Sequence, residues 1–125
     1  MARILLVEPD SVLAETLCIQ LALSGHSPLL AHDAQRAIEA MSARPDLMVL
    51  EVQLINHNGL ELLYELRSYP DLQDIPVIVY SFISESAVRV SPDAARLNIA
   101  QYLYKPATSF ARLAQAIEQT LTIPA

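Results

Sequence analysis

The chain has 125 residues, of which 53% are hydrophobic and 18% are charged. This composition excludes a disordered chain and favours one domain over residues 1–125, long enough to bury roughly two thirds of its unfolded surface. The net charge is −6 and the few basic residues are dispersed, which argues against nucleic-acid binding. No apolar run is long enough to span a bilayer, and the single cysteine, Cys18, excludes an intramolecular disulfide, so we expect a cytoplasmic protein.

Apolar runs bounded by turn residues alternate with stretches of helical periodicity along the chain. We predict five strands, at residues 3–7, 27–31, 45–51, 75–81 and 100–104. The helices are marked by apolar side chains at three- and four-residue spacing: Leu13, Leu17 and Leu21; Ala37, Ile38 and Met41; Leu60, Leu63 and Leu66; and Phe110, Leu113, Ile117 and Leu121. A helix after the fourth strand starts afresh at Ser91-Pro92-Asp93 and is either short or broken in two.

Residues at the ends of these elements mark their boundaries. Asp10 or Ser11 caps the first helix, Gly25 stops it as a left-handed residue, and Asp33 caps the second helix. Pro28 has no backbone N–H to donate, which places its strand at an edge of the sheet. These boundaries leave only short connections between the elements.

Five consecutive strand–helix units predict an α/β fold with a parallel sheet covered by helices on both faces. Because the crossovers are right-handed, few topologies remain. The flavodoxin-like strand order 2-1-3-4-5 fits best, since it puts the proline-containing second strand at an edge. The carboxyl ends of strands one, three, four and five then meet at one crevice, where open α/β sheets bind their ligands. Those ends carry Glu8, Glu51, Ser81 and Lys105.

Four segments, in this order and spacing, carry a resemblance over almost the full length of the chain. They are Ile4-Leu5-Leu6-Val7-Glu8-Pro9-Asp10; Pro45-Asp46-Leu47-Met48-Val49-Leu50-Glu51 with Asn58-Gly59 beyond it; Ile75-Pro76-Val77-Ile78-Val79-Tyr80-Ser81; and Tyr102-Leu103-Tyr104-Lys105-Pro106. Each segment is weak alone, but together they resemble the receiver domain of two-component response regulators.

The resemblance implies a phosphoryl-binding site at the crevice. In the family, an Asp pair after strand one helps to hold Mg²⁺, and the Asp that ends strand three accepts a phosphoryl group from a histidine kinase. A Ser or Thr ending strand four and an aromatic residue on strand five switch position, while the Lys of a cis Lys-Pro step binds the phosphoryl oxygens. Ser81, Tyr102, Lys105 and Pro106 match this pattern.

The acidic half of the pattern departs from the family. Glu8 and Pro9 stand where the Asp pair should be, Glu51 stands at the phosphoacceptor, and Phe82 occupies a position that is usually small. Losing a carboxylate should weaken Mg²⁺ binding severely, because this ion needs near-octahedral oxygen ligands. The extra methylene of Glu51 displaces its attacking oxygen by roughly 1.5 Å, and errors of about 1 Å can cost 10²-fold in rate. We therefore expect no phosphorylation, no catalytic residue and no cofactor other than a weakly held Mg²⁺.

The other polar residues of the crevice have alternative roles. Asp10 either joins Glu8 in an acidic pocket or caps the first helix, and the cap is favoured. Lys105 is the only lysine and is expected to pair with Glu51 or Glu8, the alternative being that Glu51 is simply solvated in the cleft. Ser81 either acts at the switch or only satisfies the backbone.

Aromatic and histidine side chains complete the set of candidates. The resemblance places Tyr102 on the output face, where we expect it to be partly exposed. His26, His32 and His57 share no metal-ligand spacing, so we expect them at the surface and predict no metal site.

Three functions remain open. The first is a non-enzymatic pseudo-receiver of a two-component or phosphorelay system that binds a protein partner, such as a histidine kinase or a downstream regulator, with a homodimer through helix four, strand five and helix five as a further option. The second is a working phosphoacceptor domain with Mg²⁺ held by Asp10 and Glu51. The third is a constitutively active receiver in which Glu51 mimics phosphoaspartate. The first is favoured because acceptor geometry, metal ligand and access are all altered.

Overall fold

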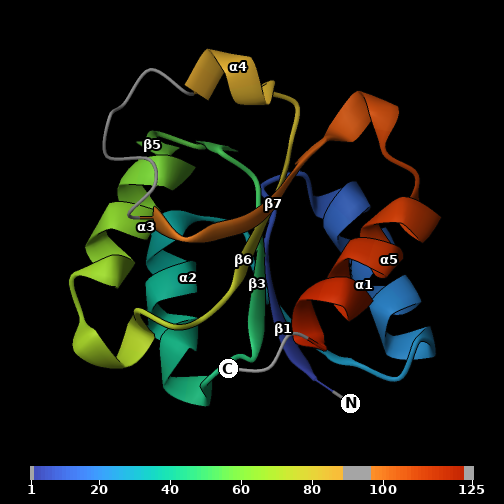
Figure 1. The fold of residues 1–125 in the computed structure, drawn as a ribbon, viewed down its shortest axis with the longest axis horizontal. Helices are drawn as coiled ribbons and strands as arrows, with labels where there is room; N and C mark the ends of the chain where they lie inside the picture. Colours follow the sequence, from blue (N-terminus) through green and yellow to red (C-terminus); the bar gives the residue numbers. More distant parts are fainter. Residues whose placement is uncertain (1, 89–96, 123–125) are drawn as a thin grey trace.

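The structure, a computed structural model, describes residues 2–88 and 97–122 (Figure 1). Its helices and strands are β1 (Arg3–Val7), α1 (Ser11–Leu23), β2 (Ser27–Ala31), α2 (Ala34–Ala40), β3 (Leu47–Leu50), β4 (Gln53–Leu54), β5 (His57–Asn58), α3 (Gly59–Arg67), β6 (Val77–Ser81), α4 (Glu85–Val88), β7 (Ile99–Tyr104) and α5 (Phe110–Leu121). Short 3-10 turns cover Met41–Ala43, Pro70–Leu72 and Lys105–Ala107.

The five long strands form one parallel sheet in the order β2-β1-β3-β6-β7. This is the flavodoxin-like order that the sequence predicts, with the Pro28 strand at one edge. Helices α1 and α5 cover one face of the sheet, and α2 and α3 cover the other (Figure 1). The predicted α/β class, with five parallel strands and helices on both faces, is confirmed.

Two apolar clusters fill the space between the sheet and its two helical layers. Leu5, Met48 and Val77 are register partners on three adjacent strands and belong to the cluster beneath α2 and α3. Their neighbours Ile4 and Leu47 point the other way, into the cluster beneath α1 and α5. Because side chains alternate along a strand and both faces are covered, β1, β3 and β6 read as continuous apolar runs.

The predicted boundary residues act as expected. The Asp10 carboxylate caps α1 by accepting hydrogen bonds from the amides of Val12 (3.0 Å) and Leu13 (3.2 Å). Asp33 caps α2 in the same way through the amide of Arg36, at 2.8 Å. Gly25 follows α1 with a φ of 91°, a conformation that glycine adopts without steric cost.

The connection between β3 and α3 has secondary structure of its own. It forms a two-stranded antiparallel hairpin, β4–β5, in which Gln53 pairs with Asn58 and Leu54 with His57. The turn uses Asn56, whose φ is 55°, because asparagine tolerates the left-handed region better than most residues. The predicted helix start at residues 91–93 lies outside the described residues, and the described part of α4 is a single turn.

Gly59 brings the start of α3 against the end of β3. Its N–H donates to the carbonyl of Val52 at 2.6 Å, and a Cβ at this position would lie 2.7 Å from the backbone oxygen of Glu51. Only glycine permits this approach without moving the backbone that carries Glu51. The close contact therefore helps to fix the position of the Glu51 side chain.

Candidate functional site

The strand register brings two buried carboxylates side by side. Val7 and Leu50 are partners on β1 and β3, so the residues that follow them, Glu8 and Glu51, lie next to each other at the carboxyl end of the sheet. Their backbones are held by hydrogen bonds from the amide of Glu8 to Ala31 and from the amide of Glu51 to Val7, both 3.0 Å. Both side chains are almost fully buried.

Lys105 bridges the two carboxylates from the end of β7. Its Nζ lies 2.7 Å from Glu8 Oε1 and 2.8 Å from Glu51 Oε1. All three side chains are at most 4% exposed, so the ion pairs lie in a poorly solvated environment. The sequence left open whether Lys105 contacts Glu8 or Glu51; the structure has both contacts. These three side chains form an ion cluster in which two carboxylates face one ammonium, so its formal net charge is −1.

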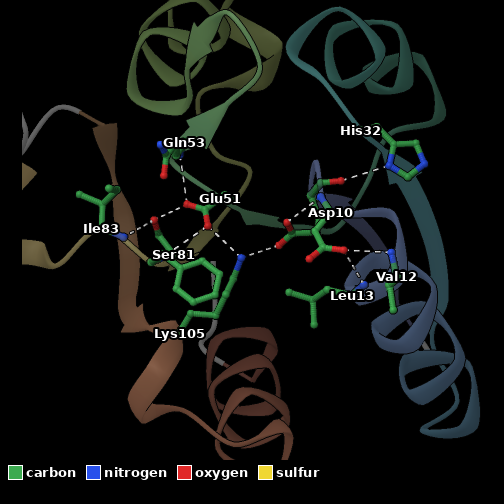
Figure 2. Close-up of polar contacts among 11 residues, drawn as sticks. Asp10, Val12, Leu13, His32, Glu51, Gln53, Ser81, Ile83 and Lys105 are labelled. Atoms are coloured by element: carbon green, nitrogen blue, oxygen red, sulfur yellow. Dashed lines mark hydrogen bonds and ion pairs between the residues drawn. The ribbon is translucent and has the colours of Figure 1, made fainter.

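Hydrogen-bond donors surround the Glu51 carboxylate (Figure 2). Oε1 accepts from Lys105 Nζ and from the amide of Phe82 at 3.2 Å. Oε2 accepts from the Ser81 hydroxyl, through a short hydrogen bond, and from the amide of Gln53 at 3.1 Å. Each oxygen of Glu51 therefore accepts from two donors. The alternative that Glu51 is simply solvated in the cleft is wrong.

The ion pairs decide the charge states of the cluster. Burial raises the pKa of the Glu51 carboxyl, but hydrogen bonds from Lys105, Ser81 and Gln53 outweigh it and hold this pKa below its ordinary value. Burial lowers the pKa of Lys105, but the contacts with Glu51 and Glu8 outweigh it and raise this pKa above its ordinary value. Glu51 is therefore ionised and Lys105 protonated at neutral pH.

Two aromatic rings flank the ammonium group. Lys105 Nζ lies 4.7 Å from the centre of the Phe82 ring and 5.3 Å from that of Tyr80, within range of cation–π attraction. Tyr80 is buried, and its burial raises the pKa of its phenol. Phe82 is 56% exposed, so it lies on the solvent side of the cluster. The rings add to the stabilisation of the protonated lysine.

A family model described as the response regulator receiver domain matches residues 4–118. The chain belongs to the receiver domain family of response regulators. Response regulator MprA of Mycobacterium avium is 36% identical over 105 residues, which are 83% of this chain and 44% of that protein. The chain thus spans less than half the length of the curated relatives it matches.

Solved receiver structures share the fold. The non-phosphorylated HemR receiver domain of Leptospira biflexa superposes with a TM-score of 0.84 at 23% identity, covering 100% of this chain and 98% of that one. Response regulator TrrA of Thermotoga maritima, in complex with Mg²⁺ and BeF, superposes with a TM-score of 0.79 at 23% identity. The match covers 95% of this chain and 98% of that one. These likenesses show that the chain shares the fold of these solved structures.

The side chains of this receiver domain do not fit the Mg²⁺ ion that the family pattern implies. Pro9 has no side-chain oxygen, and the Asp10 carboxylate points at the amides of Val12 and Leu13 (Figure 2). Of the two acids expected in the pocket, only Glu8 contacts Lys105. Among residues 2–88 and 97–122 there is no group of three His, Cys, Asp or Glu side chains placed to hold a metal ion.

The residues at the switch positions form a chain of hydrogen bonds. Besides donating to Glu51, Ser81 Oγ accepts from the amide of Ile83 at 3.0 Å. The carbonyl of Ile83 in turn accepts from the phenol of Tyr102 at 2.5 Å. Tyr102 is partly exposed, as expected, and its partial burial raises the pKa of its phenol. The turn after β6 is thus tied to Glu51 on one side and to β7 on the other.

The structure contradicts two of the expectations stated above. Among the described residues no peptide bond is cis, so the Lys105–Pro106 step is trans, and the resemblance is wrong on this point. Trans is the lower-energy form of an X–Pro bond, by about 0.5–1 kcal/mol. His26, expected at the surface, has a side chain only 8% exposed, with Nδ1 accepting from the amide of Ala2 and Nε2 2.9 Å from Glu118.

Proposed function

We propose that this receiver domain is a non-enzymatic signalling module that binds protein partners in the cytoplasm without being phosphorylated at Glu51. The observation that supports the proposal most is the engagement of both Glu51 oxygens, each with two donors. A carboxylate attacks phosphorus through an oxygen lone pair. Here that oxygen would first have to leave a buried ammonium or a buried hydroxyl, which costs free energy before any bond forms.

The electrostatics of the cluster support the same conclusion. Phosphoryl transfer depends almost entirely on positioning and on the metal ion that neutralises the developing charge. Glu8 and Glu51 already share Lys105, so a divalent cation entering between them would meet an ammonium at 2.7–2.8 Å from the oxygens it needs. Like charges at such separations repel strongly when buried. Lys105 thus takes the place between the carboxylates that a cation would need.

The partner-binding face that we propose is formed by α4, β7 and α5. A histidine kinase, a downstream regulator or a second copy of the chain would bind there. Tyr102 and Tyr104 lie on β7 and are partly exposed and exposed, respectively. The hydrogen bond from Tyr102 to Ile83 connects this face to the turn that Glu51 holds. Binding at this face therefore depends on the Glu51 contacts without needing a phosphoryl group.

Incubation with acetyl phosphate and Mg²⁺ tests the proposal. We expect the intact mass to stay unchanged, because the acceptor oxygens are engaged and the metal ligands are incomplete. A receiver domain with the full set of acidic residues, treated in parallel, serves as the positive control. A stoichiometric gain of one phosphoryl group, mapped to Glu51 and lost in Glu51→Ala, would overturn the proposal and favour the working phosphoacceptor.

A second candidate is the constitutively active receiver, and the hydrogen bond from Ser81 to Glu51 favours it. In this case the Glu51 charge itself holds the turn at Ser81–Ile83 and, through it, Tyr102. Replacing Glu51 with glutamine removes the charge at nearly constant shape. The expected result is a change in the amide signals of Phe82 and Ile83 and in the ring signals of Tyr102 by NMR.

The control for this experiment is Glu118→Gln, which removes an exposed carboxylate on α5 far along the chain from the turn. It should leave the Ile83 and Tyr102 signals in place. If Glu51→Gln also leaves them in place, the turn does not respond to the charge of Glu51 and this candidate is removed.

A further inference from the structure

A groove of about 520 Å³ lies between α2, the β4–β5 hairpin and α3. Helices α2 and α3 cover the same face of the sheet, and the hairpin lies above α3 (Figure 1). The lining of this α2–α3 groove includes Asp33, Gln35 and Ile38 from the cap and first turns of α2, Ile55 and Asn56 from the hairpin turn, and Glu65 from α3. The groove is formed by elements other than α4, β7 and α5, so it is separate from the partner-binding face proposed above.

Two isoleucines give the groove an apolar lining. Ile55 is 65% exposed in the hairpin turn, a position that polar residues or glycine ordinarily occupy. Ile38 is half-buried: it packs against the apolar cluster beneath α2 and α3 and also lines the groove. A singly exposed isoleucine needs no explanation. One that lines a groove together with a second isoleucine offers an apolar surface to a ligand.

Two carboxylates with unused acceptor capacity line the same groove. The Asp33 carboxylate caps α2 through Oδ1, and its Oδ2 has no hydrogen-bond partner among residues 2–88 and 97–122. Glu65 is exposed, and its carboxylate has no hydrogen bond or ion pair with any residue of these two ranges. None of the described residues that line the groove is a lysine or an arginine. The described part of the chain therefore leaves the negative charge of the groove uncompensated.

The combination of charge and apolar surface indicates what can bind. An arginine guanidinium donates in a planar fork that matches a carboxylate, and its stem packs along apolar surface. The side-chain carbonyl of Asn56 adds an acceptor at the same groove. We propose that the α2–α3 groove binds a peptide segment of another protein that presents an arginine next to an apolar side chain. The guanidinium pairs with Glu65 and Asp33, and the apolar side chain packs against Ile38 and Ile55.

Two other occupants fit less well. Sites for free small molecules enclose about 70–90% of the ligand surface, whereas this groove is open and Gln35, Ile55, Asn56 and Glu65 are all exposed. A peptide compensates for an open groove because the residues beside its arginine add contacts of their own. A second copy of the chain would bring together two molecules of charge −6, which repel each other. A partner segment with a basic residue meets neither objection.

An NMR titration of the full-length chain tests the proposal. The probe is a short peptide that alternates arginine with leucine, and its matched control has citrulline in place of arginine, which keeps the shape and removes the charge. We expect the arginine peptide to shift the amide signals of Ile38, Asn56 and Glu65 saturably and to bind about fivefold or more tightly than the citrulline peptide. Added salt should weaken the arginine peptide and leave the citrulline peptide nearly unchanged, because salt screens exposed charges.

Substitutions in the groove locate the site. Glu65→Gln and Asp33→Asn should each weaken the arginine peptide about two- to fivefold, the range expected of exposed ion pairs, without affecting the citrulline peptide. Asparagine at position 33 keeps the helix cap. Ile55→Ser should weaken both peptides. The control is Glu61→Gln, which removes another exposed carboxylate of α3 that does not line the groove and should change neither affinity.

Several results would overturn the proposal. These are equal binding of the two peptides, a loss in Glu61→Gln as large as that in Glu65→Gln, and shifts confined to residues outside α2, the hairpin and α3. Argininamide that binds as tightly as the peptide would show a small-cation site instead. Sedimentation that shows a dimer abolished by Glu65→Gln would show self-association instead. Unchanged thermal melts of the variants check that each of them is folded.

Discussion

Replacing Lys105 with methionine is expected to lower the free energy of unfolding by about 3–5 kcal/mol at neutral pH. The substitution keeps most of the side-chain volume but removes the ammonium that lies 2.7 Å from Glu8 and 2.8 Å from Glu51. Two almost fully buried carboxylates then face each other without a counter-ion. Urea unfolding followed by circular dichroism measures the loss. The control is Arg112→Met, which removes an exposed cation and should change stability by less than about 0.5 kcal/mol.

The loss should depend on pH in a definite direction. In the wild type the pKa of Glu51 is lowered, so its contribution to stability is present above the unfolded-state pKa and is lost as the pH falls through the folded-state value. In Lys105→Met the ion pairs are gone and burial raises the pKa of Glu51 instead. The variant should therefore regain stability relative to the wild type as the pH falls from about 7.5 towards 5. A difference that stays constant over this range would contradict the electrostatic explanation.

A compensating variant separates the charge from the packing. Glu8→Gln/Glu51→Gln/Lys105→Met has no ions in the cluster and should recover much of the stability lost by Lys105→Met alone, because no buried charge is left unpaired. If the triple variant is as unstable as the single one, the lost contribution of Lys105 lies in its packing against Tyr80 and Phe82 rather than in its charge.

Much of the fold follows from local features of the sequence. Continuous apolar runs such as Leu47–Leu50 require cover on both faces, which only a sheet between two helical layers provides. Pro28 specifies an edge strand because it lacks a donor. Once the sheet is parallel, the residues after its strands meet at one end. The proximity of Glu8, Glu51 and Lys105 therefore follows from topology rather than from any local pattern.

Other features of the site depend on how distant segments pack together, which no local sequence pattern specifies. The amides of Gln53 and Phe82 donate to Glu51 because the backbone turns sharply after β3 and after β6. The hairpin between β3 and α3 has no glycine in its turn and relies on Asn56, a weaker signal. Arg67 donates to the carbonyls of Leu72 and Leu97, and the second lies thirty residues away along the chain. Such contacts are settled by tertiary packing.

The departures from the family pattern should be reversible. The triple variant Pro9→Asp/Glu51→Asp/Phe82→Ala restores a second carboxylate after β1, withdraws the acceptor from Lys105 by one methylene and opens the solvent side of the cluster. We expect it to bind Mg²⁺ with beryllofluoride saturably, with NMR shifts at Ser81 and Lys105, whereas the wild type shows none. With acetyl phosphate its rate of phosphorylation should exceed the wild-type background by at least about 10²-fold, the cost of misplacing an acceptor by about 1 Å.

Each change is needed for a different physical reason, so the single variants should stay near background. Glu51→Asp alone still lacks a metal ligand, and Pro9→Asp alone leaves the acceptor engaged with Lys105. Phe82→Ala alone removes only the ring 4.7 Å from the ammonium. Adding Lys105→Met to the triple variant should abolish the gain, because the phosphoryl oxygens then lose their cation. Two results would contradict this explanation: a folded triple variant that is not phosphorylated, or phosphorylation of Glu51→Asp alone. Either would show that phosphorylation is not prevented by the combined loss of a metal ligand, of acceptor geometry and of access to the cluster.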